Sequence, residues 1–172
     1  RSSANFNVVA VSAKSKDKKR DVDLTGVEWI ADCRDIADID NIDVVIELVG
    51  GSEGVAKDLV EKAITNGKSV ITANKALVAT HGNNIGELVA KHDVMFGYEA
   101  AVAGGIPIIK TIREGLASNR LSKIYGILNG TCNYILSVMR ETGQEFEDIL
   151  ADAQRLGYAE ADPSFDVDGV DA

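Results

Sequence analysis

The stretch that decides the fold is IDVVIELVGG at residues 42–51, together with SVITANKALVA at residues 69–79. Each opens with a run rich in β-branched residues, which predicts a buried strand, and each then turns through small or polar residues. Between them, apolar residues at helical spacing over residues 55–64 predict a helix that Ser52 caps and Asn66-Gly67 ends. A strand, a helix and a second strand in this order predict a parallel βαβ unit.

The same alternation continues on both sides of this unit. Residues 8–11 and 94–98 predict two more strands, and a helical pattern runs through residues 87–89. We therefore expect an α/β fold, part of a doubly wound parallel sheet, with ligands bound at the carboxyl ends of its strands. No glycine-rich turn precedes residues 8–11, so the strand and turn that open such a nucleotide-binding sheet are expected to be missing.

The character of the sequence changes after Gly104-Gly105. Pro107 suits the first turn of a helix that runs to Leu116, and residues 122–128 predict a strand. Helices are predicted over residues 132–141 and 145–156. We expect a domain boundary near residue 102, with residues 1–102 the remainder of a nucleotide-binding domain and residues 103–172 the beginning of an α+β domain.

Composition excludes several classes of protein. The net charge of −9 argues against a nucleic-acid binder, and no apolar run approaches the about 20 residues that a membrane span needs. No export signal precedes the first strand, so a cytoplasmic location is expected. Cys33 and Cys132 have no partner at metal-ligand spacing and are expected to be reduced thiols, Cys132 a buried one. His81 and His92 lie in polar surroundings that predict surface positions.

Three motifs each allow a structural and a functional interpretation. Lys75 follows a strand directly, where it could meet the carboxylate or carbonyl of a ligand or be a solvated lysine at a helix start. The small residues of EAAVAGGIPIIK at 99–110 could aim carbonyls at a cation or allow a tight crossing between domains. In ILNGTCNYIL at 127–136, Thr131 could cap a helix or face a substrate, and capping is the more common use.

The C-terminal stretch GYAEADPSFDVDGVDA at 157–172 carries five carboxylates in twelve residues: Glu160, Asp162, Asp166, Asp168 and Asp171. A solvated acidic loop would explain them, but apolar groups such as Tyr158 and Phe165 are interleaved. A calcium loop does not fit, since the spacing differs from positions 1, 3, 5 and 12. Carboxylates here would suit an amino-acid substrate, because one can hold its ammonium group while another steers a proton.

TANKALVA at 72–79 and the three later motifs, in this order and spacing, resemble homoserine dehydrogenase over essentially the whole chain. The resemblance implies a Rossmann-type sheet followed by a substrate-binding and dimerisation domain. It also implies interconversion of L-homoserine and L-aspartate 4-semialdehyde with a nicotinamide cofactor, in threonine, methionine and isoleucine biosynthesis. The expected partners are thus a small-molecule substrate and, in the complete enzyme, a second copy forming a homodimer.

The resemblance also implies roles for individual residues. The residues matched to catalysis are Lys75 and Asp171. Those matched to the homoserine pocket are Thr131, Tyr158, Glu160 and Asp166. Those matched to cofactor contacts are Val49, Gly50, Thr72 and Lys75. Those matched to a sodium ion, bound mostly through backbone carbonyls, are Glu99, Val102, Gly104 and Ile106.

The residues after the first strand predict the choice of cofactor. Ser12 and Lys14 stand where a carboxylate would favour NAD, and the basic run that follows extends to Arg20. A hydroxyl donor and a counter-ion suit a 2′-phosphate, so NADP is expected over NAD, although NAD is possible and a solvated basic loop is the alternative.

The chain lacks two features of the family, the first glycine-rich turn and a lysine a few residues beyond Asp171. It is therefore expected to be a fragment that is inactive alone. The alternatives are a folded remnant without chemistry, or a reductase of the dihydrodipicolinate or aspartate-semialdehyde type.

Overall fold

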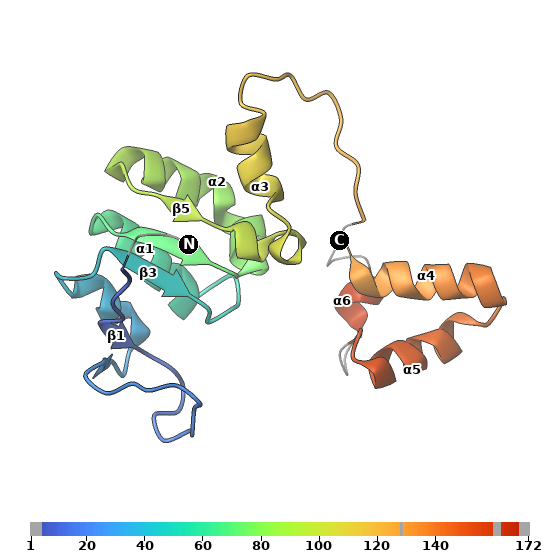
Figure 1. Cartoon of the computed structure of the whole chain (residues 1–172), viewed down its shortest axis with the longest axis horizontal. Helices are drawn as coiled ribbons and strands as arrows, with labels where there is room; N and C mark the ends of the chain where they lie inside the picture. Colours follow the sequence, from blue (N-terminus) through green and yellow to red (C-terminus); the bar gives the residue numbers. More distant parts are fainter. Residues whose placement is uncertain (1–4, 128, 160–162, 169–172) are drawn as a thin grey trace. The chain divides into compact units, whose positions relative to one another are not determined.

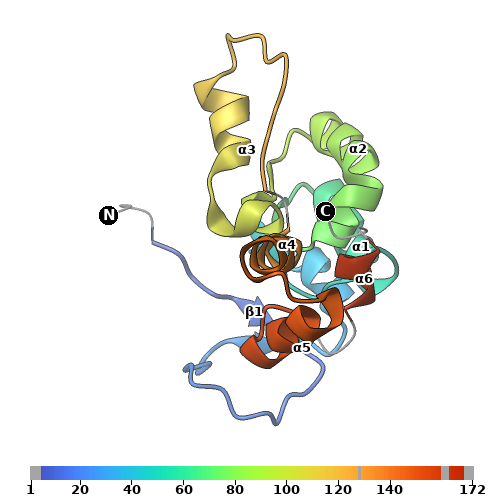
Figure 2. The ribbon, with the colours of Figure 1, turned by 90° about the vertical axis from the view of Figure 1, so that its right-hand side faces the viewer.

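The computed structural model describes residues 5–127, 129–159 and 163–168. By contacts between residues it divides into two compact units, Arg1–Ala117 and Ser118–Ala172. Figures 1 and 2 show both units in two orientations, and each unit is described by itself below.

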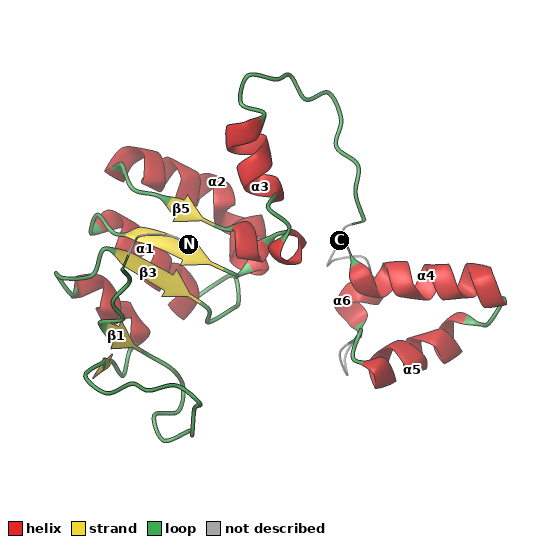
Figure 3. Ribbon diagram, in the orientation of Figure 1, coloured by secondary structure: helices red, strands yellow, loops and turns green. Residues whose placement is uncertain are grey.

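The first unit contains the predicted parallel sheet. Its strands are β3 (Val44–Glu47), β4 (Ser69–Thr72) and β5 (Phe96–Gly97), hydrogen-bonded in the order β3-β4-β5. Helix α1 (Val55–Thr65) connects β3 to β4, and α2 (Lys75–His92) connects β4 to β5 (Figure 3). The register pairs Glu47 with Thr72, so the carboxyl ends of β3 and β4 lie side by side. The predicted βαβ unit is confirmed.

One face of this sheet packs against the helices. Val45 and Val70 on the strands share a buried core with Leu59 and Ile64 of α1 and Leu77 of α2. The residues that alternate with them point away from this core and are exposed, namely Val44, Ile46 and Ile71. The strand at 42–49 was expected to be buried, but only alternate residues of its structured part are. Continuous apolar runs are typical of parallel strands that are covered on both faces of the sheet. The described helices that share this core cover only one face of this sheet.

A second, two-stranded parallel sheet precedes it, formed by β1 (Ala10–Val11) and β2 (Glu28–Trp29). The charged residues between these strands form a loop, as predicted, whereas β2 was not predicted. Its sequence, GVEWIAD at 26–32, lacks both the alternation and the β-branched run that mark a strand. A 3₁₀ helix, η1 (Cys33–Asp38), follows and packs against α1.

The predicted start of α1 is wrong and its predicted end is confirmed. The helix begins after Gly54, which has φ of 70° and makes no side-chain capping bond, so Ser52 is not the cap. A positive φ at this position suits glycine, which carries no Cβ to clash. At the other end Asn66 is the C-cap residue and Gly67 has φ of 74°, the left-handed conformation expected of a glycine stop.

After β5 the chain forms a series of short turns. These are the 3₁₀ turns η2 (Glu99–Ala101) and η3 (Ala103–Gly105), the short helix α3 (Ile108–Lys110) and the π-helical turn η4 (Thr111–Gly115). Pro107 is the residue before α3 rather than within its first turn, and the predicted helix to Leu116 is regular only over α3. Since these turns belong to the first unit, the contacts divide the chain after Ala117. A domain boundary near residue 102 stays a prediction.

The second unit is built on two helices, α4 (Gly130–Thr142) and α5 (Phe146–Leu156), followed by α6 (Ser164–Val167). Both longer helices were predicted, and they pack against each other (Figure 2, where α4 is seen end on). Their core contains Ile135, Ile149 and Ala153. Cys132 is only half-buried, not buried as expected, and Cys33 is also half-buried; neither forms a disulfide.

The strand predicted at 122–128 is wrong over its described part. Residues 121–127 have no regular structure, and Leu128 lies outside the described residues. The side chains of Ile124, Tyr125 and Ile127 are largely exposed. A strand requires a neighbour to pair its N–H and C=O groups, and no described strand pairs with this segment.

Within the described residues, no helix is both long and apolar enough to cross a membrane.

Candidate functional site

The carboxyl ends of β3 and β4 meet around one buried carboxylate. Glu47, the last residue of β3, is 0% exposed. Its Oε1 accepts hydrogen bonds from the backbone N–H groups of Val49 at 2.6 Å and Gly50 at 3.0 Å. Its Oε2 accepts from the hydroxyl of Thr72 at 2.6 Å. A buried carboxylate needs such donors to replace its hydration, and here they tie the turn after β3 to the end of β4.

Asn74 extends this network into α2. Its side-chain oxygen accepts from Leu77 N–H at 3.0 Å and so caps the helix, while its Nδ2 donates to the carbonyl of Gly51 at 2.7 Å. Its own N–H donates to Thr72 Oγ1 at 2.9 Å. The Thr72 hydroxyl therefore both donates to Glu47 and accepts from Asn74. Hydrogen bonds of Glu47 and of Asn74 therefore join the turn after β3 to the turn after β4.

The structure thus brings the predicted cofactor contacts together. Val49 and Gly50 lie in the first turn, Thr72 ends β4, and Lys75 is the exposed first residue of α2. Gly50 and Gly51 have φ of 84° and 82°, conformations that favour glycine. Apart from Gly50 and its chain neighbours, no atom of the described residues lies within 4 Å of where a Cβ on Gly50 would stand, so there is open space in front of the turn. A glycine here lets a ligand approach the backbone closely.

Glu47 itself was not singled out as a site residue. The available signal was an acidic residue at the end of a run of β-branched residues, three positions before a glycine pair. A charge inside a buried strand is costly unless it is hydrogen-bonded. That combination could have identified Glu47 as the organiser of the turn.

The predicted 2′-phosphate residues follow β1, with Ser12 half-buried and Lys14 exposed. The basic run after them is a folded loop rather than an extended one. The Arg20 guanidinium donates to the carbonyls of Ser15 at 2.7 Å and of Lys18 at 2.8 Å, and it lies 5.2 Å from the centre of the Trp29 ring. One cation of the run is therefore engaged in holding the loop closed.

The predicted sodium loop runs from Glu99 to Ile106. Both carboxylate oxygens of Glu99 accept backbone N–H groups at the start of α3, from Ile109 at 3.1 Å and Lys110 at 3.0 Å. The Ile106 carbonyl accepts from Ile108 N–H at 2.7 Å. Ala103 and Gly104 both have φ of 56°, which is unusual for alanine. The structure places these residues in one tight double turn, and their binding of a cation stays a prediction.

Metal ligands of another kind are not gathered in the described residues. Nowhere in 5–127, 129–159 and 163–168 do three side chains of the His, Cys, Asp or Glu type converge as a metal site would require.

His81 is not the surface residue that was predicted. Its side chain, on α2, is only 12% exposed, and Nε2 lies 2.6 Å from Glu53 Oε1 in the turn before α1. The hydrogen bond with His81 lowers the pKa of the Glu53 carboxyl, and the charge of Lys57 contributes to the same shift. The sequence could not show this contact, because it joins α2 to the turn before α1, 28 residues away in the chain.

The second unit brings two predicted substrate residues together. Thr131 is buried, and its hydroxyl donates to the backbone carbonyl of Tyr158 at 2.6 Å. The Tyr158 ring packs on Tyr134 with 4.8 Å between centroids. The cap of α4 is Asn129, whose side chain accepts from Cys132 N–H at 2.7 Å, so capping by Thr131 is wrong. Thr131 instead closes the turn after α5 onto α4.

The remaining predicted residues are only partly described. Glu160, Asp162 and Asp171 lie outside the described residues. Asp166 falls within α6, but the position of its side chain is not described. Asp168 follows α6 and is exposed.

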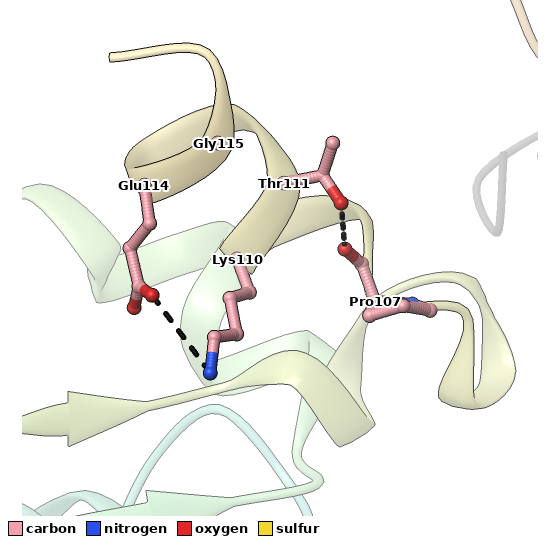
Figure 4. Close-up of a pocket in the computed structure, with 5 residues that line it drawn as sticks. All are labelled: Pro107, Lys110, Thr111, Glu114 and Gly115. Carbon is pink, nitrogen blue, oxygen red and sulfur yellow. Dashed lines mark hydrogen bonds and ion pairs between the residues drawn. The ribbon is translucent and has the colours of Figure 1, made fainter.

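A shallow hollow of about 500 Å³ lies beside α3 (Figure 4). Its lining consists of Pro107, Lys110, Thr111, Glu114 and Gly115. Across it Lys110 Nζ lies 3.8 Å from Glu114, and the Thr111 hydroxyl donates to the Pro107 carbonyl at 2.7 Å. None of the predicted site residues lines this hollow, so the volume of a hollow does not by itself locate the predicted cofactor or substrate site.

Comparison with known families agrees with this architecture. The family profile described as homoserine dehydrogenase, NAD binding domain, matches residues 1–99. The profile described as homoserine dehydrogenase matches residues 107–172. The first of these alone covers more than half of the chain.

Individual relatives carry the same name. Homoserine dehydrogenase of Pseudomonas aeruginosa is 53% identical over 172 residues, which are 100% of this chain and 39% of the relative. That of Bacillus subtilis is 44% identical over 162 residues, 94% of this chain and 37% of the relative. The chain therefore spans less than two-fifths of the length of these relatives.

Solved structures are similar as well. The crystal structure of a homoserine dehydrogenase from Thiobacillus denitrificans aligns with a TM-score of 0.78 and 54% identity, over 86% of this chain and 34% of that one. A hyperthermophilic archaeal homoserine dehydrogenase in complex with NADPH aligns with a TM-score of 0.75 and 28% identity, over 84% of this chain and 44% of that one. Profiles, relatives and structures agree, and the chain belongs to the homoserine dehydrogenase family.

Proposed function

We propose that this chain forms part of an NADP-dependent homoserine dehydrogenase, which interconverts L-homoserine and L-aspartate 4-semialdehyde. The observation that carries the proposal is the convergence of Val49, Gly50, Thr72 and Lys75 at one edge of a parallel sheet, in a chain of this family. Ligands of doubly wound sheets bind at this edge.

Different residues of the chain have different roles in this reaction. When bound, the nicotinamide supplies or accepts the hydride. Lys75 at the start of α2 steadies the charge that develops on the substrate oxygen and helps to relay its proton, together with Asp171. Glu160 holds the ammonium group of the substrate, which fixes the reacting carbon within transfer distance. Thr131, Tyr158 and Asp166 line the pocket for the rest of the amino acid.

The cofactor preference rests on the loop after β1. Ser12 and Lys14 offer a hydroxyl donor and an ammonium group with no carboxylate before Asp17. Arg20 holds the following turn closed through the carbonyls of Ser15 and Lys18, which keeps the basic run compact. A 2′-phosphate carries about two negative charges and would gain from these groups. The archaeal relative solved with NADPH supports the same choice.

Two further roles complete the proposal. A sodium ion would bind the double turn formed by Glu99, Val102, Gly104 and Ile106, in which short 3₁₀ turns and positive φ angles change the direction of successive carbonyls. The complete protein would act in the cytoplasm as a homodimer, as the family resemblance implies.

The experiment uses a chimaera, in which this chain replaces the matched 172 residues of the Pseudomonas aeruginosa relative. Homoserine oxidation is measured with NADP and with NAD. We expect turnover with both, kcat/KM higher with NADP, and a ratio that shifts toward NAD in Ser12→Asp and in Lys14→Ala. The loss of one charge-assisted contact is expected to change the ratio by about tenfold.

Lys16→Ala, in the same loop, is the matched control for loss of one positive charge. A chimaera without homoserine oxidation would contradict the proposed activity. A wild type that favours NAD, or a ratio unmoved by Ser12→Asp and Lys14→Ala, would contradict the proposed cofactor.

A further inference from the structure

Glu47 has a second property beyond its burial. The three groups that donate to its carboxylate belong to Val49, Gly50 and Thr72. These are the same three residues that are proposed, besides Lys75, to contact the nicotinamide cofactor. In the part of the chain that the structure describes, Glu47 is the only buried acidic residue. A fully buried carboxylate is therefore bonded to each of these three contacts.

The two backbone donors are consecutive along the chain. The N–H groups of Val49 and Gly50 converge on one oxygen, in the arrangement by which successive backbone amides bind an anion. The anion here is the protein's own carboxylate. These two amides are consequently not available to a phosphate. Since the Gly51 carbonyl accepts from Asn74, the turn has the Val49 and Gly50 carbonyl groups and the open space in front of Gly50 to offer a ligand.

The hydroxyl of Thr72 is engaged in the same way. It donates to Glu47 and accepts from Asn74 N–H, which leaves it little capacity for a hydrogen bond with a ligand. Asn74 in turn donates to the Gly51 carbonyl and caps α2, whose first residue is Lys75. The shape of the first turn and the start of the helix that carries the proposed catalytic lysine thus depend on one connected set of bonds.

We propose that Glu47 is a positioning residue for the cofactor: it fixes the Val49–Gly51 turn so that an uncharged part of the dinucleotide meets its carbonyl groups. This inference rests on the proposed function. Glu47 acts through the turn and through Thr72, and it does not touch the cofactor. Its removal is expected to affect cofactor binding more than the binding of homoserine.

The test compares four variants in the chimaera. Glu47→Gln keeps the size of the side chain but has one acceptor oxygen, so it cannot serve the amide pair and the Thr72 hydroxyl at once. Thr72→Val removes the donor to Oε2, and Thr72→Ser retains it. Val60→Ala is the control for stability alone, because Val60 is 0% exposed in the core and takes no part in this network.

We expect Glu47→Gln and Thr72→Val each to raise the KM for NADP about tenfold, the equivalent of about 1.4 kcal/mol, and to change the KM for homoserine much less. Thr72→Ser, which keeps the hydroxyl donor to Glu47, is expected to raise the KM for NADP less than Thr72→Val does. Because Glu47 and Thr72 act on the same turn, the double variant should lose less than the product of the two single losses. Val60→Ala should lower the melting temperature without raising the KM for NADP.

Hydrogen exchange gives a readout that does not depend on turnover. In the chimaera without cofactor, Glu47→Gln should speed amide exchange of residues 49–51, whereas Val60→Ala should leave their exchange unchanged. If Glu47→Gln does not fold, Thr72→Val and Thr72→Ser decide the question by the same measurements.

An active wild type in which Glu47→Gln and Thr72→Val lower the melting temperature but leave the KM for NADP within about twofold would overturn the inference. Glu47 would then be a core residue only. An inactive wild-type chimaera is a different result, because it overturns the proposed function and the inference with it.

Discussion

The two units differ in how their candidate residues are held. In the first unit, Glu47, Thr72 and Asn74 link two turns that follow neighbouring strands, and the proposed cofactor contacts lie on these turns. In the second unit, Thr131 and Tyr158 are joined by one hydrogen bond between a helix and the turn after the next helix. Sheet register positions the first group, whereas the second depends on the packing of two helices.

This difference leads to an expectation about chemistry. The first unit holds Lys75 at a helix start fixed by Asn74, which suits a group that acts on the reacting atoms. The second unit presents Tyr158, which is 58% exposed, on a turn that one buried hydroxyl ties down. Substitutions in the first unit should therefore affect the rate of the chemical step or the cofactor, and those in the second should affect homoserine.

The largest effect is expected for Lys75→Ala in the chimaera. Because Lys75 is proposed to steady the developing charge, its loss should lower kcat by about 10²–10⁴-fold and change the KM for homoserine little. Steady-state kinetics with both substrates measures it. Lys91→Ala, at the exposed end of the same helix, is the matched control. A kcat that remains within about twofold of the wild type would remove Lys75 from the mechanism.

The counterpart in the second unit is Thr131→Val. Without its hydroxyl the Tyr158 carbonyl loses its donor, so the turn at 157–159 should loosen and the KM for homoserine should rise about tenfold. Thr142→Val is the matched control, since Thr142 lies on the same helix and donates to the Val138 carbonyl at an exposed position. A kcat effect from Thr131→Val as large as that of Lys75→Ala would contradict the expected difference between the two units.

Glu160→Ala should likewise raise the KM for homoserine.

The sequence predicted the first unit better than the second for a physical reason. The strand at 44–47, α1 and the strand at 69–72 are consecutive; the two strands pair side by side, and α1 packs on the apolar face that they share. Local periodicity therefore sufficed to place Lys75 and the Gly50 turn at one edge. The strand predicted around Ile124 has equally suitable residues, but no described strand pairs with it, and its apolar side chains are exposed. Pattern alone cannot show whether a partner exists.

The contacts of the site residues were likewise not predictable from local sequence pattern. The strand pattern placed the Gly50 and Thr72 turns at one edge, and the family resemblance named Val49, Gly50 and Thr72 as cofactor contacts. Neither showed that Glu47 binds all three. The bond between Glu47 and Thr72 depends on the register between β3 and β4, which sequence spacing does not determine. The partnership of His81 with Glu53 was missed for the same reason, because it joins α2 to the turn before α1.

A smaller effect is expected at the caps of α2 and α4, which form a matched pair. Asn74 and Asn129 each accept a backbone N–H three residues on, at 3.0 Å and 2.7 Å. Replacing either by alanine should lower the free energy of unfolding by about 1 kcal/mol, measured by urea denaturation. Asn74→Ala should in addition raise the KM for NADP, since Asn74 also donates to the Gly51 carbonyl.

Asn74→Asp separates these two roles, because aspartate keeps the capping oxygen and loses the donor to Gly51. It should restore stability but not the KM for NADP. If Asn129→Ala raised the KM for NADP as much as Asn74→Ala did, the special role of the first cap would be disproved.

The smallest effect concerns acid, and it belongs to the first unit. The Arg34 side chain donates to both carboxylate oxygens of Asp32, through Nε at 2.9 Å and Nη2 at 2.6 Å, and with the Arg34 backbone N–H it lowers the pKa of Asp32 from 3.8 to about 2. A carboxyl whose pKa is depressed by folding contributes stability above its unfolded pKa, and this contribution is lost as the pH falls through the folded pKa. The window here is therefore from about pH 4 down to about pH 2. Because both side chains are partly exposed, solvent screens the pair and the effect is small.

The single tryptophan, Trp29, lies three residues before Asp32 and reports on this unit by fluorescence. At pH 5 the wild type should unfold at a higher urea concentration than Asp32→Asn, and the two midpoints should converge as the pH is lowered to 2. Asp152→Asn in α5, which removes the exposed pair with Arg155, is the control and should leave the Trp29 transition unchanged. Wild-type and Asp32→Asn midpoints that stay equally far apart at pH 5 and pH 2 would show that the carboxyl does not titrate with folding. The negative charge of Asp32 would then contribute nothing to the stability of the first unit through its contact with Arg34.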